Sequence, residues 1–277
     1  MCCVIDGWRL VRGPNLLIAV AGVAAGGWIA LGRLALPKLL VCAAVSGIGL
    51  GAAGNVANDL HDAEADRINH PDGARPIAAG RVTRESGHLV VWLGLLVGLG
   101  AAALVSGTQL LVGLALLTLM FIYSPGLKRA GVPGNLAVAA VAGLPPFYGA
   151  LAVGRPGAGL VPWALAAWIH LGREVVKDLQ DEAGDRQLGR RTLPIRLGRS
   201  RTVRVAWWLC VAFIPLAFLL PFLAGYAGFY YPVAAIAALS VVFAAHGLRR
   251  DRFARASILL KTAMVIGLAA LVLGRVA

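Results

Sequence analysis

The chain has 277 residues, of which 59% are hydrophobic and only 14% are charged, and its mean hydropathy is +0.77. Because soluble proteins carry about 25% charged residues, this composition excludes a small secreted domain, a coiled coil and a disordered chain. The net charge of +13 does not indicate a nucleic-acid partner here, since basic cytoplasmic loops of a membrane protein explain it better.

Apolar segments long enough to cross a bilayer recur along the chain, which predicts an all-α polytopic membrane protein. The first segment lacks a signal-peptide cleavage pattern, so we expect it to be a retained membrane span. We expect residues 1–277 to form one integral-membrane domain. Nine transmembrane helices are predicted, at residues 14–35, 38–58, 86–106, 109–124, 134–153, 160–178, 203–224, 228–247 and 257–275.

Basic residues are distributed unevenly between the two sides of the predicted bundle. With nine spans, 22 of the 26 lysines and arginines share a side with the N-terminus, and the other side has only Arg33, Lys38, Arg155 and Arg275. Cytoplasmic loops are enriched in lysine and arginine, so we expect the connections after the second, fourth, sixth and eighth helices to be cytoplasmic. All 13 acidic residues fall on that side, which predicts a cell-membrane protein with cytoplasmic active-site loops.

Nine of the 13 acidic residues occupy two short windows, at the ends of the second and sixth predicted helices. Both windows contain the pattern D-x-x-D-x-x-x-D-R, displaced by 119 residues, which indicates an internal duplication. Two parallel four-helix repeats and one additional helix would bring both acidic ends to one face, around a central cavity. The pattern comprises Asp59, Asp62, Asp66 and Arg67 in the first window and Asp178, Asp181, Asp185 and Arg186 in the second.

Each acidic window is predicted to form a stripe on a helix, because residues three, four, seven or eight apart share a face. Stacked carboxylates repel one another, and oxygen ligands favour a hard cation such as Mg²⁺ or Ca²⁺. Two Mg²⁺ ions bridged by a diphosphate would suit two facing stripes, so we predict a metal–diphosphate site. The stripes consist of Asn58, Asp62 and Asp66 with Asp59 beside them, and of Glu174, Asp178, Asp181 and Asp185.

Three other interpretations of the acidic windows remain open. The carboxylates could be solvated helix ends paired with nearby arginines, although two matched copies disfavour this. A diiron site would require two Glu-x-x-His pairs, and only Glu85 with His88 has that spacing. A secondary transporter would also be built from repeats, but its ion sites would lie near the middle of the membrane rather than at helix ends.

Basic and aromatic residues accompany the acidic windows. Guanidinium and ammonium groups form charge-assisted hydrogen bonds with phosphate, so nearby basic side chains are candidates for binding a diphosphate. Aromatic side chains within the spans are candidates for shielding a carbocation, although packing is their commoner role. The basic candidates are Arg67, Arg75, Lys128, Arg129, Lys177 and Arg186, and the aromatic ones are Phe121, Tyr123, Phe147, Tyr148 and Trp168.

Four segments of the chain resemble the UbiA superfamily of intramembrane prenyltransferases. Its first aspartate-rich motif is matched by N-D-L-H-D-A-E-A-D-R-I-N at residues 58–69, followed by R-P-I-A-A-G at residues 75–80. Its second is matched by K-D-L-Q-D-E-A-G-D at residues 177–185, followed by G-R-R-T-L-P-I at residues 189–195. R-G-P-N at residues 12–15 and Y-S-P-G-L-K-R at residues 123–129 are also similar to family segments, so the likeness covers most of the chain.

The resemblance implies a nine-helix bundle with a central cavity, Mg²⁺ dependence, and transfer of a prenyl group from a prenyl diphosphate to a lipid-like acceptor. The loop before Arg75 is longer than the family pattern, which puts the role of that arginine in question. The implied metal ligands are Asn58, Asp59, Asp62, Asp66, Asp178, Asp181 and Asp185, with Asp62, Asp66, Asp181 and Asp185 as the catalytic set. The expected substrate-binding residues are Asn15, Arg67, Arg75, Tyr123, Lys128, Lys177 and Arg186.

Within the superfamily, residues 171–178 and 192–195 are most similar to archaeal-type geranylgeranylglyceryl phosphate geranylgeranyltransferases. This resemblance implies transfer of a geranylgeranyl group to the hydroxyl of an alkyl glycerol phosphate. Mg²⁺ and basic side chains would neutralise the diphosphate, so that the allylic carbon–oxygen bond ionises before or during attack. Homogentisate-type and chlorophyll-type members have similar second motifs, so the alternative is an aromatic acceptor of the 4-hydroxybenzoate, homogentisate or naphthoate type.

Overall fold

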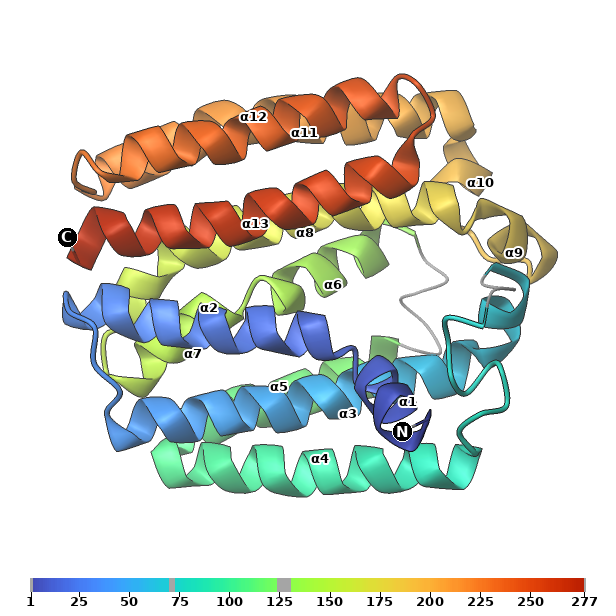
Figure 1. The fold of residues 1–277 in the computed structure, drawn as a ribbon, viewed down its shortest axis with the longest axis horizontal. Helices are drawn as coiled ribbons and strands as arrows, with labels where there is room; N and C mark the ends of the chain where they lie inside the picture. The colour runs from blue at the N-terminus through green and yellow to red at the C-terminus, as the bar shows by residue number, and fades with distance from the viewer. Residues whose placement is uncertain (1, 70–72, 124–130, 277) are drawn as a thin grey trace.

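The computed structural model describes residues 2–69, 73–123 and 131–276, and these ranges contain helices and loops but no strand. The long helices lie side by side along one direction and form a bundle (Figure 1). The principal helices are α1 (Cys2–Leu10), α2 (Gly13–Leu31), α3 (Lys38–Asn69), α4 (Arg84–Val105), α5 (Gly107–Tyr123), α6 (Val132–Ala142), α7 (Pro145–Ala152), α8 (Leu160–Gln180), α9 (Glu182–Gln187), α10 (Leu193–Leu197), α11 (Arg199–Leu223), α12 (Tyr230–Leu248) and α13 (Phe253–Val276).

Each of the nine predicted spans falls on a helix, but the helices differ in how well they suit a membrane. Among the described residues, six are long and apolar enough to cross a bilayer, namely α2, α3, α4, α11, α12 and α13. The fifth predicted span is divided into α6 and α7, which are bent by 42° and would make a seventh span together. Pro145 and Pro146 begin α7, and proline cannot continue a helix that precedes it. These helices indicate an integral membrane protein.

Close packing of α2 against α7 depends on glycine. A Cβ atom at Gly26 would lie 1.8 Å from the carbonyl oxygen of Pro146, and one at Gly149 would lie 1.8 Å from that of Val23. Small residues let the backbones of membrane helices approach closely in this way. Larger clusters of buried apolar side chains lie among α8, α11, α12 and α13, and between α3 and α4.

The two acidic motifs differ in secondary structure. The first lies on α3, which continues to Asn69, eleven residues beyond the predicted end of the span. The second is interrupted, because α8 ends at Gln180 and Asp181 lies between α8 and α9. The prediction of one continuous carboxylate stripe from Glu174 to Asp185 was therefore wrong.

The short helix α9 is held against the end of α3, which gives a physical reason for the interruption. The backbone N–H of Gly184 donates a hydrogen bond to Asn69 Oδ1 over 3.0 Å. A Cβ atom at Gly184 would lie 2.5 Å from that oxygen, so only glycine fits without displacing the amide. The turn at Asp181 brings α9 onto α3 and places the two motifs at one end of the bundle, near α9 and α10 in Figure 1.

Candidate active site

A cavity of about 500 Å³ lies within the bundle and is lined by residues of the helices from α2 to α9 and from α11 to α13. Most of its lining residues are apolar, as in sites for lipid-like ligands. Polar residues are concentrated where α3 and α8 end, so an apolar chamber leads to a charged end. The polar lining there includes Arg12, Asn58, Asp178, Asp181, Asp185 and Arg190.

The first motif is surrounded by arginines. Asp59 is only 1% exposed and accepts a hydrogen bond from Arg12, which precedes α2. Arg75 lies between two carboxylates of this motif, 3.8 Å from Asp59 and 3.7 Å from Asp66. The longer loop before Arg75 therefore does not remove this arginine from the acidic residues.

Arg190 joins the two motifs. Its guanidinium lies 2.8 Å from Asp62 of the first motif and 2.9 Å from Asp185 of the second. Burial lowers the pKa of Arg190, but these two carboxylates outweigh that effect and raise it on balance. Asp62 is not among the described lining residues of the cavity, so the first motif meets the second through Arg190, which lines the cavity and which sequence reasoning did not single out.

The remaining carboxylates of the second motif face the cavity. Asp178 accepts a hydrogen bond of 2.8 Å from the side-chain amide of Asn135 on α6. Asp181 and Asp185 also line the cavity. Asn135 was not predicted as a site residue, and its position on an apolar helix carried no motif that would have identified it.

Some of the side-chain oxygens near the two motifs are suitable ligands for a hard cation. Asn58 Oδ1 and Asp59 Oδ2 are buried without a hydrogen-bond partner among the described residues, and buried oxygens of this kind are suitable ligands for Mg²⁺. In the described ranges, however, no three acidic, histidine or cysteine side chains are grouped closely enough to hold a metal. Arg12, Arg75 and Arg190 lie among the carboxylates instead.

The predicted basic residues have different surroundings. Lys177 lines the cavity and donates to Glu174 over 2.7 and 3.0 Å. Arg67 donates to the carbonyl of Ala78 over 3.2 Å, and Arg186 is 64% exposed and pairs with Glu182. Arg67 and Arg186 are absent from the described cavity lining, so their role in substrate binding stays a prediction. The side chains of Phe121 and Tyr123, and all of Lys128 and Arg129, lie outside the described residues.

Of the aromatic candidates, only Tyr148 has a place in the described cavity lining. Its hydroxyl forms a 2.7 Å hydrogen bond with Ser46 Oγ. Trp168 donates to the carbonyl of Leu209, and Phe147 packs against Trp163, which fits a packing role for both.

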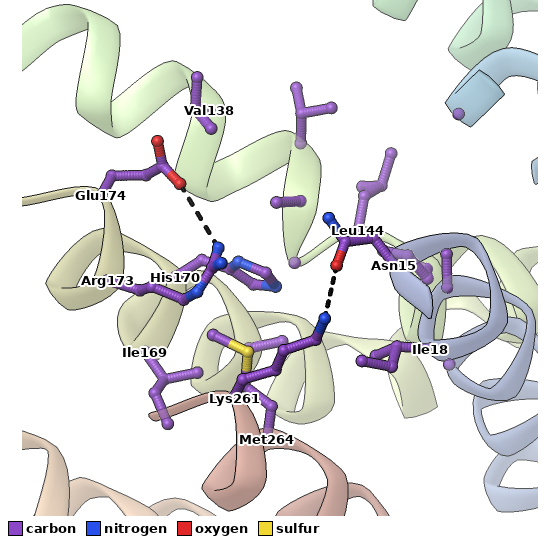
Figure 2. Close-up of a pocket in the computed structure, with 18 of the residues that line it drawn as sticks. Asn15, Ile18, Val138, Leu144, Ile169, His170, Arg173, Glu174, Lys261 and Met264 are labelled. Carbon is purple, nitrogen blue, oxygen red and sulfur yellow. Dashed lines mark hydrogen bonds and ion pairs between the residues drawn. The ribbon is translucent and has the colours of Figure 1, made fainter. Parts of the chain in front are cut away.

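A second polar region of the cavity was missed from the sequence (Figure 2). Lys261 of α13 donates a hydrogen bond of 2.7 Å to Asn15 Oδ1 on α2, so the predicted residue Asn15 does lie in the cavity wall. Arg173 and His170 of α8 lie close by. The signal was present, because Arg173 and Lys261 are charged residues inside predicted spans, and such residues are functional candidates by default.

Sequence comparison identifies relatives over nearly the whole chain. A digeranylgeranylglyceryl phosphate synthase from Halobacterium salinarum is 38% identical over 271 residues, covering 96% of each chain. One from Thermococcus gammatolerans is 35% identical over 248 residues, covering 88% of this chain and 87% of that protein.

Structural comparison agrees with this result. A UbiA homologue from Archaeoglobus fulgidus, solved bound to GPP and Mg²⁺, has a TM-score of 0.70 at 18% identity and covers 96% of this chain and 99% of its own. The model of the UbiA prenyltransferase family matches residues 17–274. Together with the two aspartate motifs at the cavity, these matches confirm that the chain belongs to the UbiA prenyltransferase family.

Proposed function

We propose that the protein transfers a geranylgeranyl group from geranylgeranyl diphosphate to the hydroxyl of geranylgeranylglyceryl phosphate, with Mg²⁺ as cofactor. The observation that carries the proposal is the meeting of both aspartate motifs, through Arg190, at the charged end of an apolar cavity. The acceptor is taken from relatives named digeranylgeranylglyceryl phosphate synthase, which match up to 96% of the chain. A lipid chain of the donor or acceptor suits the apolar part of the cavity.

Seven residues are proposed to hold Mg²⁺ and the donor diphosphate. The buried oxygens of Asn58 and Asp59 that lack hydrogen bonds support this assignment. When bound, Mg²⁺ would neutralise negative charge on the diphosphate and make it a better leaving group. The proposed ligands are Asn58, Asp59, Asp62, Asp66, Asp178, Asp181 and Asp185, among which Asp62, Asp66, Asp181 and Asp185 are proposed to be catalytic.

Basic residues of the chain are proposed to bind the leaving diphosphate as well. Arg12, Lys177 and Arg190 all line the cavity and pair with carboxylates. Hydrogen bonds from such cations to phosphate oxygens strengthen as charge develops on the leaving group. Arg75, near Asp59 and Asp66, is proposed to act with them.

The reaction exchanges one carbon–oxygen bond for another. The bond between the allylic carbon and the diphosphate breaks, and a bond forms between that carbon and the acceptor hydroxyl. The hydroxyl proton passes to a carboxylate of the site or to an oxygen of the released diphosphate. The apolar wall excludes water, which would otherwise compete with the acceptor for the allylic carbon.

The topology follows from the charge distribution. We propose that residues 1–277 form one membrane domain of nine passages, as two four-helix repeats and one further helix around the cavity. Two observations support it: in the described ranges, eight helices and the bent pair of α6 and α7 lie at the nine apolar segments, and 22 of 26 basic residues fall on one side of this predicted topology. The positive-inside rule then places the aspartate motifs at the cytoplasmic face of the cell membrane.

Product formation by the purified protein in detergent tests the proposed function. Geranylgeranyl diphosphate and Mg²⁺ are supplied with geranylgeranylglyceryl phosphate, 4-hydroxybenzoate or homogentisate in parallel reactions. We expect turnover only with the glycerol phosphate. Turnover of an aromatic acceptor instead would overturn the acceptor assignment, and no turnover with any acceptor would overturn the proposed reaction.

A further inference from the structure

Two basic side chains of the cavity wall are left without close carboxylate partners. Lys261 has the neutral amide of Asn15 as its hydrogen-bond acceptor and makes no ion pair among the described residues. Arg173 has one carboxylate nearby, Glu174, at 3.9 Å. That carboxylate is already bonded to Lys177 at 2.7 and 3.0 Å, so it compensates the charge of Arg173 only weakly.

Unsatisfied polar atoms lie in the same part of the wall. Arg173 Nε and His170 Nδ1 are buried and have no hydrogen-bond partner within the described ranges. Figure 2 shows His170, Arg173 and Lys261 directed toward a common space between α2, α8 and α13. Arg173 Nε is a buried donor without a partner, which is costly in the free protein, and a ligand that accepts hydrogen bonds would remove that cost. His170 Nδ1 can donate to the same ligand in the tautomer that carries its proton.

These features contrast with the aspartate end of the cavity. There the cations Arg12, Arg75 and Arg190 are each paired with aspartates, whereas around Lys261 positive charge exceeds negative charge. A metal would be repelled by this part of the wall, and an anion would be attracted to it.

We propose that Lys261 and Arg173 bind the phosphate of the glycerol phosphate acceptor, with His170 contributing to the same subsite. This inference rests on the proposed function, in which the donor carries a diphosphate and the acceptor carries a phosphate. It assigns a binding site to the phosphate of the acceptor. The donor diphosphate then occupies the aspartate end, and the acceptor phosphate is held by amino-acid side chains without a metal.

The positions along α8 set the order of the two proposed subsites. Arg173 precedes Asp178 by five residues and Asp181 by eight, and α8 continues to Gln180. At 1.5 Å per residue this separation is roughly 7 to 12 Å along the helix axis. The phosphate and the reacting hydroxyl belong to the same three-carbon glycerol unit, so a phosphate near Arg173 places the hydroxyl toward the aspartates.

The test compares two acceptors, geranylgeranylglyceryl phosphate and its unphosphorylated counterpart geranylgeranylglycerol, in wild type and in Lys261→Met. Hydrogen bonds to a charged group are each worth about tenfold to 100-fold in binding, so we expect KM for the phosphorylated acceptor to rise by about that factor. KM for geranylgeranyl diphosphate and kcat/KM with the unphosphorylated acceptor should change by less than about threefold. Lys261→Arg should retain most of the preference for phosphate.

Binding without turnover provides an independent readout. Wild type should bind geranylgeranylglyceryl phosphate in EDTA, because the subsite needs no metal, and Lys261→Met should bind it more weakly. Arg173→Gln tests the same subsite if Lys261→Met does not fold. Lys38→Met is the matched control, since Lys38 is exposed at the start of α3 and outside the cavity.

The possible outcomes distinguish a failure of the phosphate subsite from a failure of the proposed function. If wild type turns over no glycerol phosphate acceptor, the proposed function fails. If wild type prefers the phosphorylated acceptor and both Lys261→Met and Arg173→Gln keep that preference unchanged, the phosphate subsite is refuted while the proposed function stands. An equal rise in KM for the donor and the acceptor would also refute it, since the two side chains would then not distinguish the substrates.

Discussion

The first acidic motif lies on an uninterrupted helix. The second has the same spacing of aspartates, but its helix ends within the motif and the chain turns there. α3 runs through Asp59, Asp62 and Asp66 to Asn69, but α8 stops at Gln180. Position 184, which corresponds to Ala65 of the first motif, is glycine, and its backbone contacts Asn69. Two copies of one pattern thus become complementary parts: a straight helix end and a short helix that packs against it.

The partners of corresponding aspartates also differ. Asp59 is paired with the guanidinium of Arg12, whereas its counterpart Asp178 is bonded to the neutral amide of Asn135. Asp62 and Asp185 share Arg190. The carboxylates therefore have the same spacing in both copies of the motif, whereas the surrounding elements determine how each negative charge is balanced.

The largest expected effect tests whether both copies are needed for chemistry. Asp62→Ala and Asp181→Ala should each lower turnover by at least about 100-fold, because each removes a proposed ligand of the metal–diphosphate site. Product formation in detergent measures this, and thermal unfolding checks that the variants fold. Asp251→Ala, at an exposed turn, is the control. Near-normal activity of either variant would contradict the metal assignment.

Arg190→Met tests the connection between the copies. It leaves two buried aspartates, Asp62 and Asp185, without a shared cation, and breaking a buried ion pair typically costs about 3 to 5 kcal/mol. The melting temperature in EDTA should fall, and Mg²⁺ with diphosphate should restore part of it. Arg250→Met, at an exposed turn, should have little effect. An unchanged melting temperature for Arg190→Met would show that this arginine does not join the motifs.

The different partners of Asp59 and Asp178 predict unequal effects. Arg12→Met removes the cation paired with the buried carboxylate of Asp59 and should lower the free energy of unfolding by about 3 kcal/mol, since Arg75 at 3.8 Å compensates only in part. Asn135→Ala removes a neutral donor to a carboxylate and should cost about 1.5 kcal/mol. Denaturant titration of both variants measures the difference. Equal costs, or a reversed order, would contradict the proposed difference in charge balance.

The smallest expected effect concerns the glycine that distinguishes the second copy. Gly184→Ala places a Cβ atom 2.5 Å from Asn69 Oδ1, which must move and lose its hydrogen bond, at a cost of about 1 kcal/mol. Asn69→Ala should cost a similar amount, and the double variant should cost little more than either. Gly100→Ala on the exposed side of α4 is the control and should not destabilise the protein. Additive losses in the double variant would argue against the contact.

Much of the architecture could be predicted, because the segments that form membrane helices are recognisable by their length and apolarity. The family assignment was confirmed, and the described residues form helices at each predicted segment, of which six, or seven with the bent pair, are long and apolar enough to cross a membrane. The bend between α6 and α7 was foreseeable from Pro145 and Pro146 but was not predicted. The apolar span was predicted to end at residue 58, and the helical stripe predicted for Asn58, Asp62 and Asp66 was found on the continuation of α3 to Asn69.

The acidic residues of the site were apparent from their spacing, but their partners were not. Arg12 lies 47 residues from Asp59 and Arg190 lies 128 residues from Asp62, and no local pattern encodes such distant contacts. The turn at Asp181 depends on packing of α9 against α3, which a helical periodicity cannot reveal. Arg173 and Lys261 were overlooked because they were counted as topology signals, although their positions within spans favoured a site.

Binding of Mn²⁺ in the presence of a non-reactive thio analogue of geranylgeranyl diphosphate tests most directly whether the two motifs form one site. Electron paramagnetic resonance would count the bound ions in wild type, Asp62→Ala and Asp181→Ala. The account predicts that wild type binds Mn²⁺ together with the analogue and that a substitution in either motif weakens the binding of both. Unchanged binding of the ion and the analogue in both variants would contradict a shared metal–diphosphate site.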